Sequence, residues 1–301
     1  MTDQNEFARQ PEWLAERFEE NRIRLRAVAY RMLGSLGEAE DAVQEAWLRL
    51  SRSDADRIEN LSGWLTTVVA RVCLDVLRSR KSRAEESIGT QPQEPTVKKG
   101  EGSDPEQEAK LADSVGLALL VVLERLAPAE RVAFVLHDLF GLPFEEIATI
   151  VERSLTATRQ LASRARRRLR GVGQAPSASL SEQREVIKAF LTAFRAADVE
   201  GLLAVLDPDL VVRVDAVAAR AHAPQEVHGA QNWARGAVAF AKLIRPATIC
   251  LVDGAVGIVW APNGRLSRAL RFAMKDGKIA QIEILADRAR LDALQLAVLP
   301  D

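Results

Sequence analysis

The sequence predicts a multidomain protein in which two all-α domains are followed by an α+β domain. A length of 301 residues points to two or three domains, since a typical domain holds roughly 100–150 residues. Apolar residues recur at spacings of three, four and seven through most of residues 13–170, the period of amphipathic helices. Beyond about residue 185 the chain changes to runs rich in valine and isoleucine, which favour strands.

The first domain is predicted to hold three helices. The first covers Trp13–Leu33 and is ended by Gly34 and Gly37, and the second runs from about Glu38 to Leu50. Ser62 is the expected N-cap of a third long helix, which finishes in a basic cluster near Arg83. The helical period places these residues of the second helix inward: Ala39, Ala42, Val43, Ala46 and Leu50.

A flexible linker is predicted between about Ala84 and Asp104, where the hydrophobic pattern stops and prolines and glycines appear among charged residues. A second linker is expected over Gly171–Ser181. The resulting domains are 1–88, a linker at 89–105, 106–173 and 174–301. Removing the residues after about Gly173 is therefore expected to leave a folded two-domain core.

The second domain is predicted to be helical and to end in a helix-turn-helix. After helices over Leu111–Leu126 and Ala129–Leu139, a short helix Phe144–Val151 and a longer helix Leu155–Leu169 flank a tight turn. Residues 153–170 contain seven arginines and no acid, although the whole chain has a net charge of −1. The second helix would enter a major groove, where arginine and glutamine pair with base edges. A solvated, arginine-rich face is the alternative.

The last domain is predicted to start with a helix around Val186–Phe194 and to end in an antiparallel meander. Its apolar runs are Thr248–Trp260, Leu266–Met274 and Ile279–Leu285. Asn263-Gly264 and Asp276-Gly277 separate them, and both dipeptides suit type I′ hairpin turns. Three strands are expected from these three runs.

Composition excludes several classes of protein. Hydrophobic residues make up 48% and charged residues 28%, which is typical of a globular chain. The polar start and the lack of a long apolar run predict no export signal and no membrane span, and hence a cytoplasmic protein. Cys73 and Cys250 lie in different predicted domains, so we expect two buried, unpaired thiols.

Segments in both helical domains carry a family resemblance. Leu126–Arg131, Phe134–Ala148 and Arg159–Arg166 resemble conserved region four of the extracytoplasmic-function (ECF) RNA polymerase sigma factors. Glu38–Leu50 is similar to region two of the same family. The two signatures stand in the family's order, one in each helical domain. The resemblance implies a non-enzymatic protein that directs RNA polymerase to promoters, with no catalytic residues, metal or other cofactor.

The resemblance also implies partners and contact residues. Core RNA polymerase would bind through its β′ clamp and β flap, and promoter DNA at the minus-ten and minus-thirty-five elements. Core contacts are expected at Asp41, Gln44, Glu45 and Leu48, although a polar helix face is more often merely solvated. DNA contacts are expected at Asn60, Arg78, Arg80, Arg153, Thr156, Arg159, Gln160, Ser163, Arg164 and Arg167. Asn60 would bind a flipped, single-stranded base, and the basic end of the third helix, Arg71 to Arg83, would hold phosphates.

The C-terminal segment resembles the cone-shaped SnoaL-like domain, which is related to nuclear transport factor two (NTF2) and ketosteroid isomerase. The matching pieces include Phe190–Ala197, Asp198–Asp209 and Phe272–Ile284. Asp215–Ala219 departs from the usual Asp-Gly-Gly-Gly-Lys, and Ala286–Leu291 departs from an Asn-Pro-Asp-Lys-Leu-like motif. The resemblance implies a regulatory module that acts on its own chain, with an anti-sigma factor or a small ligand as open alternatives for a partner of this domain.

An enzymatic tail is the minority interpretation. An isomerase would need a carboxylate base such as Asp215 or Asp253, and His222 or His228 could act as acid or base, but the only tyrosine is Tyr30 in the first domain. A helix-turn-helix regulator with a small-molecule-sensing or enzymatic tail is the alternative for the whole chain. It would not explain Glu38–Leu50.

Overall fold

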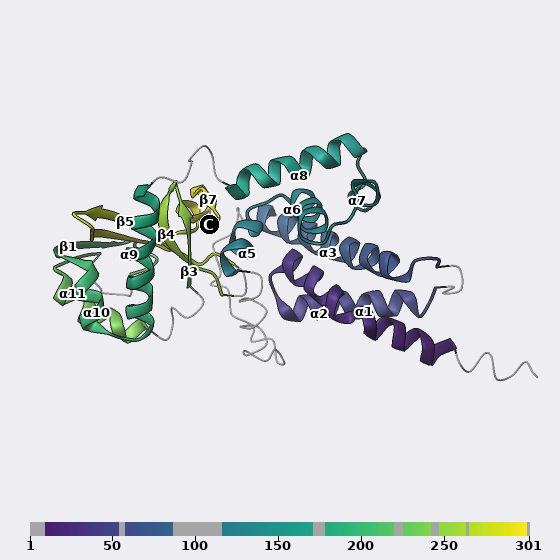
Figure 1. The fold of residues 1–301 in the computed structure, drawn as a ribbon, viewed down its shortest axis with the longest axis horizontal. Coiled ribbons are helices and arrows are strands. Elements are labelled where there is room, and N and C mark those ends of the chain that lie inside the picture. Colours follow the sequence, from purple (N-terminus) through teal and green to yellow (C-terminus); the bar gives the residue numbers. More distant parts are fainter. Residues whose placement is uncertain are drawn as a thin grey trace, which may run out of the picture. The chain divides into compact units, whose positions relative to one another are not determined.

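A computed structural model of the chain describes residues 10–53, 58–86, 116–170, 178–219, 225–241, 247–262 and 265–299. The described residues form two compact units. The first holds 10–86 and 126–165, and the second holds 116–125 and 166–299. The predicted fold class is confirmed, because helices dominate the sequence up to residue 170 and an α+β domain follows (Figure 1).

The first unit begins with helices α1 (Gln10–Leu33), α2 (Leu36–Leu50) and α3 (Leu61–Glu86), which pack on one another. The predicted inward stripe of α2 is buried throughout. Gly34 ends α1 with a φ of 75°, a conformation that glycine adopts without steric cost. Two cap predictions were wrong. Gly37 lies within the first turn of α2, and α3 is capped by the side chain of Asn60, which accepts a hydrogen bond from the N–H of Gly63.

Shorter helices complete the first unit. They are α6 (Pro128–Phe134), a π-helical turn η3 (Val135–Leu139), α7 (Phe144–Val151) and most of α8 (Leu155–Arg170). Glu152 ends α7 in the left-handed conformation with a φ of 56°, which makes the tight break before α8. The predicted helix-turn-helix is therefore present with nearly the predicted bounds.

The second unit is built on a mixed sheet. Its helices are α5 (Leu117–Glu124), the last turn of α8, α9 (Ala178–Arg195), α10 (Val199–Val205), α11 (Ala230–Ala237), a 3-10 turn η4 (Val238–Phe240) and α12 (Arg288–Ala293). Its strands are β1 (Leu206–Val214), β2 (Glu226–His228), β3 (Ala247–Val252), β4 (Ala255–Trp260), β5 (Arg268–Lys275), β6 (Lys278–Leu285) and β7 (Leu296–Ala297). Within the described residues the strand order is β2-β1-β6-β5-β4-β3-β7, with β1 and β6 parallel.

The meander has one more strand than the sequence predicted. The run Thr248–Trp260 is two strands, β3 and β4, joined by Asp253-Gly254 with φ values of 51° and 85°. Asp276-Gly277 joins β5 and β6 with φ values of 50° and 75°, so positive φ at both residues confirms the predicted type I′ turn. Asn263-Gly264 lies outside the described residues.

Aromatic side chains fill the space between α9, α11 and the sheet, where the three elements meet in Figure 1. The ring of Phe190 lies 5.4 Å from that of Phe272 and 5.9 Å from that of Trp233. Both cysteines are buried and unpaired, as predicted, and burial raises the pKa of each thiol to about 12. In the part of the chain that the structure describes, no helix combines the length and apolarity needed to cross a membrane.

Candidate nucleic-acid and protein interfaces

The outer face of α2 carries the residues expected to bind another protein. Asp41, Gln44 and Leu48 are exposed, and Glu45 is half-buried. Glu45 also accepts a hydrogen bond from Arg49 at 2.8 Å, one turn further along the helix. Leu48 is 39% exposed, although Ala46 and Leu50 of the same helix are buried. The structure thus brings the four predicted residues together on one face.

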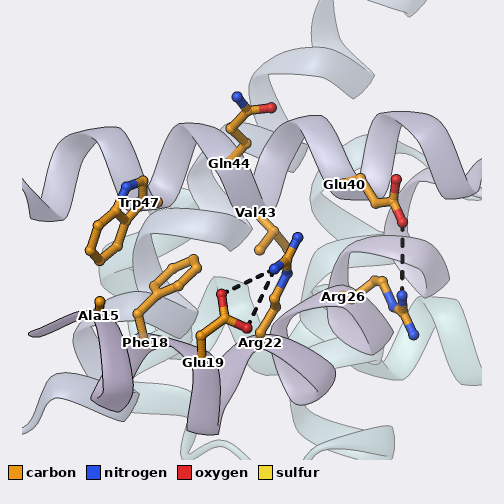
Figure 2. A pocket seen from close by; sticks show the side chains of 9 residues that line it. All are labelled: Ala15, Phe18, Glu19, Arg22, Arg26, Glu40, Val43, Gln44 and Trp47. Atoms are coloured by element: carbon orange, nitrogen blue, oxygen red, sulfur yellow. Dashed lines mark hydrogen bonds and ion pairs between the residues drawn. The ribbon is translucent and has the colours of Figure 1, made fainter. Parts of the chain in front are cut away.

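A hollow of about 400 Å³ lies beside this face, between α1 and α2 (Figure 2). Phe18 and Trp47 form its apolar end, with ring centroids 5.0 Å apart. Arg22 pairs with Glu19 at 3.0 Å, and Figure 2 shows Arg26 reaching toward Glu40 across the other end. Sequence reasoning missed this hollow because its lining comes from two helices whose contact no single helical pattern specifies.

Asn60 holds the start of α3. Its side-chain oxygen accepts a hydrogen bond from the N–H of Gly63 at 3.0 Å, while its carbonyl accepts one from Trp64 at 2.9 Å. A Cβ added at Gly63 would lie 2.8 Å from the side-chain nitrogen of Asn60. Glycine at this position therefore leaves room for the Asn60 side chain, which stays exposed beside the helix end.

The basic residues of α3 have different environments. Arg78 is exposed and faces solvent beside Asp75 at 3.8 Å. Arg80 points inward instead: it pairs with Glu38 and donates a hydrogen bond to the carbonyl of Leu33 at 3.0 Å. Its side chain is 19% exposed. These contacts favour a packing role for Arg80 within the three helices, in place of the predicted phosphate contact.

Helix α8 presents a sharply divided surface. Leu161, Ala162, Ala165 and Leu169 are buried, as predicted, and Thr158 joins them. The predicted DNA-contacting side chains are all exposed: Arg153, Thr156, Arg159, Gln160, Ser163, Arg164 and Arg167. Arg159 lies 3.7 Å from Glu145 on α7 and over the ring of Phe144, both at the protein surface. The geometry is that of a helix that exposes one basic face to an anionic partner.

Arg164 has a second role that the sequence did not reveal. It pairs with Glu130 of α6 at 3.1 Å, and the Glu130 side chain is only 6% exposed. Glu130 also accepts a hydrogen bond from the N–H of Ala127 at the start of α6. A buried carboxylate is costly without a partner, so Arg164 both faces solvent and stabilises the packing of α8 on α6.

Two polar contacts tie α6 and α7 to the first three helices within the first unit. Arg131 is 3% exposed and donates to the carbonyl of Arg31 at 3.3 Å. Arg71 of α3 donates to the carbonyl of Thr149 of α7 at 3.3 Å. Arg71 had been expected to hold phosphates. In this arrangement its guanidinium binds the protein's own backbone.

The comparisons with known proteins assign families to both helical regions. Residues 17–83 match the sigma-70 region 2 family, and residues 116–169 match the sigma-70 region 4 family. The probable ECF RNA polymerase sigma factor SigI of Mycobacterium tuberculosis is 38% identical over 276 residues, which cover 89% of this chain and 91% of SigI. The chain belongs to the ECF RNA polymerase sigma factors.

Further relatives are of the same family. The M. tuberculosis ECF sigma factor SigJ is 35% identical over 283 residues, covering 90% of each chain. The crystal structure of SigJ matches 92% of this chain and 98% of its own, with 34% identity and a TM-score of 0.45. The sequence matches to SigI and SigJ confirm the predicted family, and with it the predicted function in promoter-directed transcription by RNA polymerase. Both sequence matches extend beyond regions 2 and 4 into the C-terminal domain.

The candidate catalytic residues of this sigma factor's C-terminal domain have structural partners. Asp215 accepts hydrogen bonds from the N–H groups of Ala218, Ala286 and Asp287 at 2.6–2.8 Å. Burial alone would raise the pKa of Asp215, but these backbone hydrogen bonds lower it below the ordinary value. A general base near neutral pH needs the opposite shift.

The other two described candidates lie in exposed or turn positions. Asp253, in the β3–β4 turn, accepts a hydrogen bond from the N–H of Gln295 at 2.9 Å. His228 is exposed on β2 and lies 2.8 Å from Glu226. A side-chain hydrogen bond from Arg213 lowers the pKa of Glu226. His222 lies outside the described residues.

Proposed function

We propose that region 2 of this sigma factor, residues 17–83, docks on core RNA polymerase through the exposed face of α2. The observation behind the proposal is the division of α2 into a buried stripe and an exposed face that carries Asp41, Gln44 and Leu48. Exposed leucine among charged neighbours suits a protein interface, where apolar contact provides affinity and the polar rim provides register. The β′ clamp is the partner that the family resemblance implies for this face.

The exposed face of α8 is proposed to bind the minus-thirty-five element. Thr156, Arg159 and Gln160 lie near the start of the helix, where side chains reach base edges in the major groove. Arg153, Ser163, Arg164 and Arg167 would contact phosphates, and these contacts position the helix without sequence preference. The β flap would carry this region within the holoenzyme.

Promoter melting is assigned to the start of α3. Asn60 is exposed and is fixed by its hydrogen bond with Gly63, so its side-chain N–H group can contact an unstacked base. The exposed Arg78 can bind the strand's phosphates. Arg80 is left out of this site because its guanidinium is bound inside the protein.

The C-terminal domain is proposed to set the activity of the sigma factor rather than to catalyse a reaction. Aromatic side chains occupy the space between α9, α11 and the sheet, and Asp215 has a lowered pKa. Both features fit a module that works through contacts. An anti-sigma factor or a small ligand could act on the same domain from outside.

Reconstitution with purified core polymerase tests the assignment. The chain should form a stoichiometric holoenzyme and produce run-off transcripts from a subset of linear genomic fragments, none of which core alone transcribes specifically. Arg159→Ala should form the same holoenzyme but discriminate less among these fragments. If Arg159 contacts a base, its loss should reduce the free-energy difference between right and wrong sequences by about 1–3 kcal/mol. Binding to DNA without binding to core would contradict the proposal and favour a conventional regulator.

A further inference from the structure

Region 4 of this chain is divided between the two compact units at both of its ends. The family match covers residues 116–169. Of these, 126–165 belong to the first unit, while 116–125 and 166–169 belong to the unit that contains the C-terminal domain. The first helix of region 4 and the last turn of its recognition helix therefore pack as parts of the C-terminal domain.

The first point of attachment is Arg125, directly after α5. Its guanidinium donates to the side chain of Asp292 at 3.0 Å and to the carbonyl of Leu291 at 2.7 Å, both on α12. The preceding Glu124 accepts a hydrogen bond from the N–H of Leu266 at 2.9 Å. The side chain of Arg125 is 21% exposed, so both hydrogen bonds are partly shielded from water.

Apolar packing adds to this polar attachment. Four consecutive residues of α5, Leu120 to Leu123, are each at most 1% exposed. Because each residue advances about 100° around a helix, four in a row cover most of its circumference. Such a helix is stable only when other elements pack around it, and strand β3 is one of the elements that contact α5.

The second point of attachment lies at the other end of region 4. The N–H of Val298, just after β7, donates to the carbonyl of Leu169 at 2.9 Å. The last carbonyls of a helix have no partner inside the helix, so this hydrogen bond satisfies one of them. Leu169 itself is 5% exposed.

Helix α12 is held in place by the core of the C-terminal domain. Asp215, at the end of β1, binds the backbone N–H groups of Ala286 and Asp287. Asp287 in turn caps α12 by accepting from the N–H of Arg290 at 2.9 Å. The sheet thus fixes the helix that presents Leu291 and Asp292 to Arg125.

We propose that the C-terminal domain is a clamp that holds region 4 at both ends, with Arg125 as the positioning residue of the clamp. Only Leu126 and Ala127 separate Arg125 from the start of α6. The inference deepens the proposed function, since it names a contact by which the C-terminal domain holds the first end of the region 4 segment.

Amide hydrogen exchange on the full-length protein tests the clamp. In Arg125→Ala, peptides from α5 should exchange at least about tenfold faster than in the wild type, because two hydrogen bonds to a charged group are lost. Peptides from the β5–β6 hairpin should be unchanged. Equal protection of α5 in the variant and the wild type would overturn the proposal.

Matched variants separate the clamp from general damage. Arg288→Ala removes the other partner of Asp292, at 3.0 Å within α12, and should leave α5 protected. Asp292→Asn alters an exposed side chain, keeps the Leu291 carbonyl and should speed α5 exchange by less than Arg125→Ala does. If Asp292→Asn and Arg288→Ala had the same effect on α5, the contact with Arg125 would carry no energy and the clamp would be wrong. The measurement needs neither polymerase nor DNA, so a failure of the proposed promoter function would leave its outcome intact.

Discussion

Regions 2 and 4 each match a sigma-70 family, yet they differ in how they are built. The region 2 match, residues 17–83, lies in one compact unit. The region 4 match begins and ends in the other unit. A family match marks a stretch of sequence, whereas a compact unit is defined by which residues pack against one another. In this chain the two definitions agree for region 2 and disagree for region 4.

The physical cause of the difference is the composition of α5. Helix α2 has a buried stripe and a polar face, so neighbours on one side are sufficient. Helix α5 reads Leu-Ala-Leu-Leu-Val-Val-Leu-Glu and has no polar face except its last residue. A small helical module would leave part of such a helix exposed to water, and the cost of that exposure is removed by the C-terminal domain.

Truncation after Gly173 should produce the largest difference in stability between region 2 and region 4. Without the C-terminal domain, Glu124, Arg125 and Leu169 lose the partners described above, and side chains of α5 meet water at about 1.5–3 kcal/mol for each one fully exposed. Region 4 should then lose its exchange protection before region 2 does. This differs from the folded two-domain core that the linker pattern suggested. Protection of α6–α8 at the full-length level in the truncated chain would contradict it.

A second prediction separates two exposed arginines of α8. Arg164→Ala should lower the free energy of unfolding by about 1–3 kcal/mol, because it removes the ion pair with the buried Glu130 carboxylate. Arg159→Ala should cost less than about 1 kcal/mol, since its ion pair with Glu145 is exposed. Thermal unfolding of both variants, followed by run-off transcription, distinguishes packing from recognition. Equal losses of stability in the two variants would show that the ion pair with buried Glu130 stabilises the fold no more than the ion pair with exposed Glu145.

The sequence predicted the exposed faces well because helical period decides them. The inward stripe of α2 and the outward side chains of α8 follow from counting residues, and all were placed correctly. The Asp276-Gly277 turn was found for a similar reason, since positive φ at two successive residues has a short sequence signature.

Contacts between elements distant in sequence could not be predicted in this way. Arg80 and Arg164 look alike in the sequence as basic residues of a polar face, yet Glu38 and Glu130 give them structural partners. The attachment of Arg125 to Leu291 and Asp292 spans more than 160 residues, and no local pattern encodes it. The Asp253-Gly254 turn was missed because the apolar run on both sides of it was treated as one strand.

A third prediction concerns region 2 as a self-contained unit. Asp41→Ala combined with Leu48→Ala should weaken binding to core polymerase at least about tenfold while changing the free energy of unfolding by only about 0.5 kcal/mol, as surface substitutions do. Leu50→Ala is the matched control, since Leu50 is fully buried and its truncation should cost about 2–5 kcal/mol. Sedimentation with core polymerase measures the affinity. If the double variant melts early but binds normally, the two residues are structural.

The last prediction concerns Asp215, which binds the backbone at the start of α12. Asp215→Asn keeps one acceptor oxygen but removes the charge that three backbone N–H groups bind, so the second unit should lose about 1–2 kcal/mol at neutral pH. The folded pKa of Asp215 is lowered, so its contribution is fully present above the unfolded value of about 3.9 and is lost as the pH falls through the folded pKa. The difference in the free energy of unfolding between wild type and variant should therefore stay at about 1–2 kcal/mol from pH 5 to 7 and shrink below about pH 4.

Asp209→Asn is the control, because Asp209 is an exposed carboxylate on the same strand, and it should leave the stability of the second unit unchanged. Chemical denaturation followed by exchange of α5 and α12 peptides gives both readouts, and exchange of region 2 peptides should not respond. A loss of stability that appeared equally in region 2 would mean that the two regions unfold together, and the contrast between them would not hold.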